Sequence, residues 1–165
     1  MAEDEKNGKG KNMNLLAKLK ELGHDLPEAA SPAANYVPFV ISGKSLHIAG
    51  QIPFLNGQPM HKGRLGEDLT KEEGVKAAEA CALNILAQVN KAVDGDWSKV
   101  ARCVRLGVFV NSTPDFTDQP EVANGASNLI AAVMGEAGKH ARAAVGVASL
   151  PRGVAVEVDA LFELK

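Results

Sequence analysis

The chain has 165 residues and a nearly balanced charge, with 18 Lys and Arg against 20 Asp and Glu and a formal net charge of −2 at pH 7. This length suffices for one domain with a hydrophobic core, whereas the weak charge and the 4% aromatic content argue against a dedicated nucleic-acid surface. No apolar run reaches membrane-spanning length and no N-terminal segment resembles a signal peptide, so we expect a cytoplasmic protein.

The N-terminus divides into a polar tail and a short helix. Residues 1–12 are charged and rich in Gly and Asn, with little to bury, which predicts a disordered tail. Leucines at helical spacing predict a helix over residues 14–22, capped by the side chain of Asn14. We therefore assign residues 13–34 to a helical extension with its linker, and residues 35–165 to the main domain.

Two strands and a long helix follow. Residues 36–42 and 46–51 have the composition of strands and join at Gly43-Lys44, which predicts a hairpin. The next stretch, 55–69, is polar and Gly-rich without clear periodicity. Thr70-Lys-Glu-Glu73 is a capping box, and apolar residues recur at helical spacing after it, so a long helix begins there.

The C-terminal half again alternates strand and helix. Residues 100–111 read as a long strand, and a second helix runs from Gln119 or Pro120 to between Met134 and Glu136, with Pro120 in its first turn. Two alternating strands come last, and we predict that they pair as a hairpin around a loop at 150–153. This order indicates an α+β domain with two main helices packed on one face of a sheet.

One face of the predicted C-terminal hairpin carries Arg142. Matching the valine rows of the two strands places Arg142 beside Ala144 and Gly146, whose small size leaves a hollow. A guanidinium beside a hollow suits a small carboxylate, because it donates two parallel hydrogen bonds. The same register puts Glu157 opposite Gly146, roughly 13 Å from Arg142, so the two side chains would serve different positions or different pockets at a subunit boundary. The alternative is a solvated or ion-paired arginine, with Glu157 or Asp159 as its partner.

No residue pattern predicts a metal or cofactor site. The four histidines are scattered without ligand spacing, and the chain has no P-loop, dinucleotide-binding glycine pattern or nucleophile elbow. Cys81 lies in a helical pattern and Cys103 in a strand pattern, and neither has a CxxC partner. We therefore expect two reduced core cysteines, no metal and no cofactor.

Two motifs are similar to those of one known family. The stretch HARAAVGVASLPRGVAVEVDALFEL at 140–164, together with IAGQIPF at 48–54, resembles the YjgF / reactive intermediate deaminase (RidA) family, also known as L-PSP endoribonucleases. The similarity covers nearly everything from Tyr36 to Leu164, and the chain looks most like a longer branch with an N-terminal extension. The resemblance implies a chorismate-mutase-like fold with a mixed sheet, assembled as a homotrimer.

The resemblance also implies a reaction and its residues. The reaction is the hydrolysis of a reactive 2-imino acid, or its enamine tautomer, to a 2-oxo acid and ammonia. Arg142 would bind the substrate carboxylate, Glu157 would position or activate water, and Ala144 would contribute its backbone. Tyr36 and Gln51 would line the same pocket.

Two departures from the family pattern keep other functions open. Ala49 stands where many deaminases have a hydroxyl residue, and Ala144 stands where a cysteine is common. The first hypothesis is an imine and enamine deaminase. The second is a non-catalytic protein that binds a carboxylate ligand at subunit interfaces, and the third, an endoribonuclease, has little support from so few aromatic and basic residues.

Overall fold

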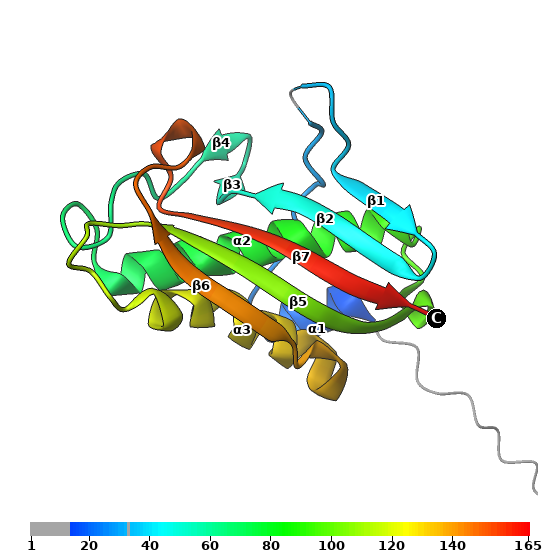
Figure 1. Ribbon diagram of the computed structural model, residues 1–165. Coiled ribbons are helices and arrows are strands. Elements are labelled where there is room, and N and C mark those ends of the chain that lie inside the picture. The colour runs from blue at the N-terminus through cyan, green and yellow to red at the C-terminus, as the bar shows by residue number, and fades with distance from the viewer. Residues whose placement is uncertain (1–13, 33) are drawn as a thin grey trace, which may run out of the picture.

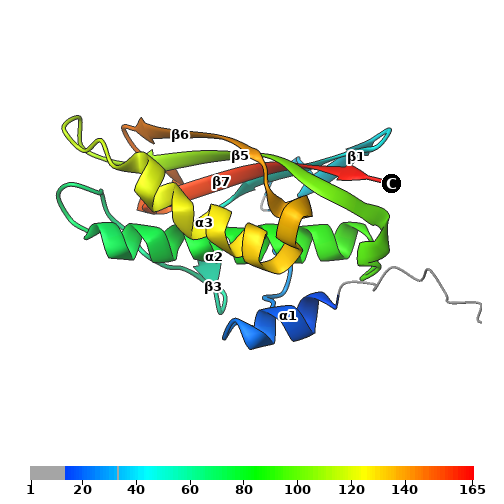
Figure 2. The same cartoon turned by 90° about the horizontal axis from the view of Figure 1, so that it is seen from below.

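A computed structural model describes residues 14–32 and 34–165. Its main feature is a five-stranded sheet in the order β1-β2-β7-β5-β6, with the long helices α2 and α3 packed on one face (Figures 1 and 2). The predicted α+β architecture is therefore confirmed, whereas the predicted tail at 1–12 lies outside the described residues. The helices are α1 (Leu15–Glu21), α2 (Lys71–Ala92) and α3 (Gln119–Met134). The strands are β1 (Phe39–Ser42), β2 (Ser45–Gln51), β3 (Phe54–Leu55), β4 (Gln58–Pro59), β5 (Val100–Asn111), β6 (Ala141–Val147) and β7 (Val156–Leu164).

The starts of α1 and α2 follow the capping signals in the sequence. The Asn14 side chain accepts a hydrogen bond from the backbone N–H of Ala17, and α1 begins directly after it. Thr70 and Glu73 form both bonds of the capping box at the start of α2. These bonds satisfy N–H groups that have no partner within the helix, which is why each helix begins at that residue.

The sheet is mixed. β1 and β2 form the predicted antiparallel hairpin, and Gly43 takes the positive φ of 59° that its turn requires. β7 pairs antiparallel with both β2 and β5, whereas β6 pairs in parallel with β5 at the edge of the sheet.

The predicted C-terminal hairpin is wrong, because β6 and β7 are not neighbours. α3 carries the chain from the end of β5 back to the side of the sheet where β5 begins, so β6 runs parallel to β5, and β7 then returns on the other side of β5. Val156 and Val158 face the helices, whereas Val145 and Val147 face away from them. The valine rows that the prediction matched therefore lie on opposite faces of the sheet.

Close packing of small residues holds the two long helices together. At Gly125 of α3, an added Cβ would overlap the backbone carbonyl of Val75 in α2, and Ala78 lies next to the same point. α1 packs on the outer side of this helix layer (Figure 2), where Leu15 and Leu19 join the core. The helical extension is thus part of the hydrophobic core of the domain.

Candidate functional site

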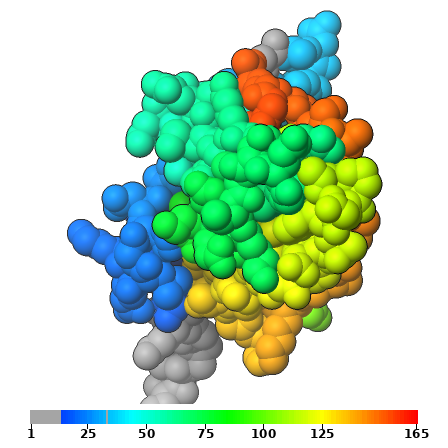
Figure 3. Space-filling view, turned by 90° about the vertical axis from the view of Figure 1, so that its left-hand side faces the viewer, coloured from blue at the N-terminus to red at the C-terminus, as the bar shows by residue number. Residues whose placement is uncertain are grey.

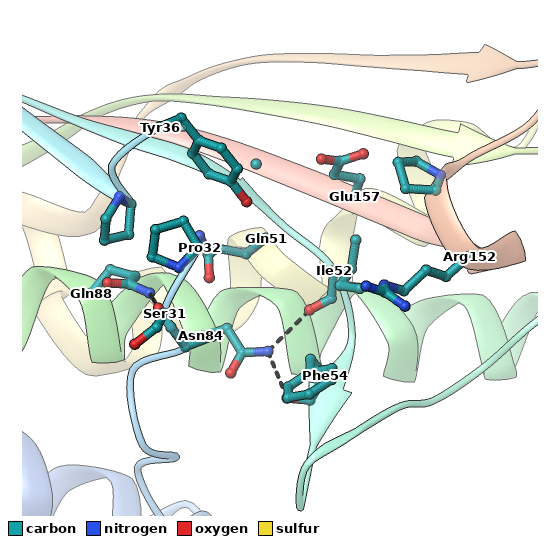
Figure 4. A pocket seen from close by; sticks show the side chains of 14 residues that line it. Ser31, Pro32, Tyr36, Gln51, Ile52, Phe54, Asn84, Gln88, Arg152 and Glu157 are labelled. Atoms are coloured by element: carbon teal, nitrogen blue, oxygen red, sulfur yellow. Dashed lines mark hydrogen bonds between the residues drawn. The ribbon is translucent and has the colours of Figure 1, made fainter. Parts of the chain in front are cut away.

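A cavity of about 370 Å³ opens where β2 passes beyond the start of β1 (Figure 4). It is bounded by the extension, α2, the segment before β1 and the start of β7. At the same end of the molecule, the β3–β4 hairpin and the turn Pro151–Gly153 lie side by side at the surface (Figures 1 and 3). Gly63, in the loop after β4, donates its N–H to the carbonyl of Gly153. The lining residues are Ala30, Ser31, Pro32, Tyr36, Pro38, Gly50, Gln51, Ile52, Phe54, Asn84, Gln88, Pro151, Arg152 and Glu157.

Glu157 supplies the carboxyl group of this cavity. It lies on β7 and faces away from the helices, beside Gly50 of β2, where an added Cβ would overlap the carboxyl oxygen. Partial burial, and then the negative charge of Asp159, raise the pKa of Glu157 above its ordinary value. Asp159 itself pairs with Arg105 at 3.7 Å. A carboxyl group in this state can accept and return a proton closer to neutral pH than a solvated glutamate can.

Two more of the sequence-predicted site residues line the same cavity. Tyr36 points its hydroxyl group into the cavity from the segment before β1, and more than half of its side chain is exposed (Figure 4). Gln51 is buried, and its amide donates to the carbonyl of Ala49 at 3.0 Å. Three of the five predicted residues, Tyr36, Gln51 and Glu157, therefore meet in one place within a single chain.

Arg142 lies elsewhere. It sits on the edge strand β6, level with Leu106 of β5, and its side chain is on the helix face of the sheet. Its guanidinium donates to Asn124 Oδ1 at 2.9 Å, to Ser127 Oγ at 3.1 Å and to the carbonyl of Pro120 at 3.3 Å, all on α3. None of the ion pairs among residues 14–32 and 34–165 involves Arg142. The guanidinium is thus held by neutral acceptors, and its charge stays available to an anion.

Arg142 and Glu157 are separated as expected, although for a different reason. Glu157 is level with Phe109 on the face away from the helices, and β5 lies between the strands of the two residues. They therefore lie on opposite faces of the sheet, and not on one face of a hairpin. Ala144 follows Arg142 on the helix face of β6, level with Val108, so it too lies apart from the cavity around Glu157.

Sequence reasoning missed four polar residues of the cavity, Ser31, Asn84, Gln88 and Arg152. The Asn84 amide donates to the carbonyls of Ile52 and Phe54, at 3.0 and 2.9 Å, and so fixes the Gly-Gln-Ile-Pro segment against α2. The Gln88 amide donates to the carbonyl of Ala30 at 2.8 Å and ties the extension to the same helix. The spacing of four residues between Asn84 and Gln88 places them on one side of α2, but two polar residues at this spacing are equally typical of a surface position. Arg152 has a left-handed φ of 60° in a turn, and no sequence signal points to it.

The remaining reactive side chains lie outside the cavity. Cys81 and Cys103 are buried with free thiols, as predicted, and burial raises the pKa of the Cys103 thiol to about 12. Within residues 14–32 and 34–165, no three His, Cys, Asp or Glu side chains are grouped as they would be to bind a metal ion. No helix in that part of the chain is both long and apolar enough to cross a membrane.

A family model, a sequence relative and a solved structure each match almost the whole chain. The model of the YjgF/chorismate mutase-like family matches residues 16–163. Protein TCP17 of Trypanosoma cruzi is 56% identical over 151 residues, which are 91% of this chain and 94% of TCP17. The solved structure of Atu1372 from Agrobacterium tumefaciens, a protein of unknown function, has a TM-score of 0.87 and 52% identity, and the match covers 92% of each chain.

The likeness extends to a more distant solved structure. RidA from the Antarctic bacterium Psychrobacter sp. PAMC 21119 has a TM-score of 0.55 and 26% identity, and the match covers 84% of this chain and 94% of RidA. The motifs at 48–54 and 140–164 thus belong to a shared fold. The chain is a member of the YjgF/chorismate mutase-like family.

Proposed function

We propose that this protein hydrolyses reactive 2-imino acids and their enamine tautomers to 2-oxo acids and ammonia, at sites that two copies of the chain share. One observation carries the proposal. Arg142 is a partly buried guanidinium without a carboxylate partner among the described residues, oriented by three neutral oxygen atoms. A charge kept free in this way suits the carboxylate that every 2-imino acid carries.

The reaction needs only a held substrate, a water molecule and a group that moves a proton. An enamine first takes a proton on carbon and becomes the protonated imine. Water then adds to the carbon of its C=N bond while Glu157 accepts one proton of the water molecule, and a neutral tetrahedral amino alcohol forms. Glu157 returns this proton to the nitrogen, and the hydroxyl group loses its proton as the C–N bond breaks, so that ammonia leaves, the 2-oxo acid remains and one proton is released. The raised pKa of Glu157 supports this role.

The positions of the two residues support a site that is shared between copies. Within one chain, Arg142 and Glu157 lie on opposite faces of the sheet with β5 between their strands, which is too far apart for one small substrate. Arg142 is on one edge strand, and the cavity of Glu157 lies near the other edge. A cyclic assembly that brings these edges together unites the two groups, and we propose the trimer that the family resemblance implies.

The second candidate function is binding of a carboxylate ligand without its hydrolysis. Ala49 favours it, because an alanine at this position offers no hydroxyl group to a substrate or to water. Such a protein would use Arg142 in the same way and would need no proton transfer by Glu157. The two functions therefore differ in whether the bound ligand is hydrolysed, whereas in both of them Arg142 binds the carboxylate of the ligand.

The test is an imine hydrolysis assay. An amino-acid oxidase acting on 2-aminobutanoate generates 2-iminobutanoate, and release of 2-oxobutanoate and ammonia is followed with wild type, Arg142→Ala and Arg102→Ala. Wild type should accelerate release, and Arg142→Ala should lose roughly 30-fold to 1,000-fold in kcat/KM, the cost of about 2–4 kcal/mol for a lost charged hydrogen-bond pair. Arg102 is an exposed arginine on β5 and serves as the matched control. No acceleration by wild type with several imino acids would contradict the proposed reaction, and retained binding of 2-oxobutanoate would then support the binding protein.

A further inference from the structure

A chain of hydrogen bonds ends at Arg142, and the other groups in this chain have no role in the proposed reaction. Ser127 Oγ, on α3, lies 3.1 Å from Nη1 of Arg142 and 2.9 Å from Nε2 of His140. Nδ1 of His140 in turn lies 2.6 Å from the carbonyl oxygen of Gly138. The four groups come from α3, from the turn that follows it and from the start of β6.

The last bond of this chain fixes the direction of all the others. A carbonyl oxygen can only accept, so Nδ1 of His140 carries the proton in the bond to Gly138. In the neutral imidazole, Nε2 is then an acceptor, and the Ser127 hydroxyl donates to it. The lone pairs of Ser127 Oγ are consequently turned toward Arg142, and every bond in the chain polarises the next.

This arrangement leaves one edge of the Arg142 guanidinium without a partner among the described residues. A guanidinium has five N–H bonds, and those of Nη1 are taken by Asn124 and Ser127, while one of Nη2 is taken by Pro120. Nε–H and the second N–H of Nη2 have no acceptor among residues 14–32 and 34–165. Nε and Nη2 form one edge of the guanidinium, which can donate two parallel hydrogen bonds to a carboxylate.

We propose that Ser127 and His140 are positioning residues, which hold Arg142 so that its Nε–Nη2 edge meets the substrate carboxylate. The inference rests on the proposed role of Arg142 as the carboxylate anchor. A carboxylate at position 127 would orient the arginine as well, but it would also neutralise the charge that the ligand needs. A serine whose hydroxyl bonds to the His140 imidazole gives the orientation without that loss.

The choice of side chain supports a role beyond packing. Ser127 lies in the interior of α3, where a serine hydroxyl commonly bonds back to the carbonyl four residues earlier. Here it bonds to two side chains from beyond the helix. The neighbours of Ser127 on the buried side of α3 are alanine and isoleucine, so an alanine at 127 would satisfy the packing alone.

The experiment measures binding of two probes, 2-oxobutanoate and its neutral amide, to the full chain by calorimetry. Ser127→Ala should weaken 2-oxobutanoate about tenfold, which corresponds to about 1.4 kcal/mol, and should leave the amide unchanged. Ser127→Thr restores the hydroxyl group and should restore the affinity. His140→Phe removes the acceptor of that hydroxyl group and should match Ser127→Ala, and the double variant should be no weaker than either single one.

The decisive comparison is made without the arginine. In an Arg142→Ala background, Ser127→Ala should cause no further loss of 2-oxobutanoate affinity. A further tenfold loss there, an equal loss for the amide, or wild-type affinity in Ser127→Ala while Arg142→Ala binds weakly would each overturn the inference. Wild-type affinity in Arg142→Ala would overturn the anchor and this inference together. Failure of the proposed reaction would give a different result. Wild type would then not hydrolyse imines but would still bind 2-oxobutanoate through Arg142.

Discussion

The surroundings of Glu157 suit its carboxyl group to proton transfer, but they also lower the stability of the folded protein near neutral pH. Its carboxyl group lies in a partly closed cavity next to Asp159, and both surroundings raise its pKa above the ordinary 4.5. The folded state therefore binds the proton more tightly than the unfolded chain does. Stability from this group is fully present below pH 4.5, and it is lost as the pH rises from there through the pKa of the folded state.

Replacing Glu157 by glutamine removes this titration. We expect Glu157→Gln to be more stable than wild type at pH 7, with a gap that closes as the pH falls below 4.5. Urea unfolding at fixed protein concentration, repeated between pH 4 and pH 8, measures the free energy of unfolding of both proteins. Parallel stability curves over this range would show that the cavity does not shift the pKa of Glu157.

At the residue scale, the family resemblance points to Tyr36, Gln51 and Glu157, and the structure places these three side chains around one cavity. Their roles in that cavity belong to the proposed function. Asn84 and Gln88 were not selected, because in an Ala-rich helical pattern a polar residue reads as a surface position unless the partner of the helix is known. Their partners are backbone carbonyls far away in the sequence, which no local pattern shows.

Among the elements, the contact between α2 and α3 depends on one glycine. An alanine at Gly125 would gain about 1 kcal/mol of helix propensity, but its Cβ would overlap the Val75 carbonyl, which belongs to the backbone of α2 and cannot turn aside. Overpacking costs about 1–3 kcal/mol, and an overlap with rigid backbone lies in the upper part of that range, so after the gain in propensity we expect Gly125→Ala to be destabilised by roughly 1–2 kcal/mol. Chemical unfolding checks this, with the exposed Asn128→Ala on the same helix as the control. Gly125→Ala as stable as wild type would contradict the close helix contact.

Element types were predictable, and strand neighbours were not. The caps at Asn14 and Thr70 and the turn at Gly43 each act over a few residues, so the sequence shows them directly. The partner of β6 depends on the path of α3, which brings the chain back to the edge of the sheet. The alternation of apolar and polar residues in a strand does not depend on which strand lies next to it. The valine rows of β6 and β7 therefore predicted a hairpin between two strands that are not neighbours.

At the scale of the whole molecule, no helix among the described residues 14–32 and 34–165 covers the second face of the sheet (Figure 2). Apolar side chains on this face include Val40, Phe109, Val145 and Leu161, and Val145 is 47% exposed. An apolar sheet face of this kind is characteristic of contact with other copies of a chain. It is the face on which Glu157 lies.

We therefore expect a charge on this face to break the assembly. Val145→Asp should elute as a smaller species than wild type, because burying an unpaired carboxylate in an apolar contact costs several kcal/mol. Leu16→Asp is the matched control, since Leu16 is 61% exposed on α1, beyond the helix layer. Light scattering coupled to size exclusion gives both masses. A wild-type mass for Val145→Asp, or a monomeric wild type, would contradict an assembly through this face.

The central claim, a site shared between copies, has a direct test in mixed assemblies. Arg142→Ala and Glu157→Gln chains are co-expressed with different affinity tags, and assemblies that contain both are purified through the two tags in turn. In a cyclic trimer, each mixed assembly has one interface with both wild-type groups, so imine hydrolysis should return to about one third of the wild-type rate although each variant alone should retain only a small fraction of it. Mixed assemblies no more active than the separate variants would show that Arg142 and Glu157 do not act in one shared site.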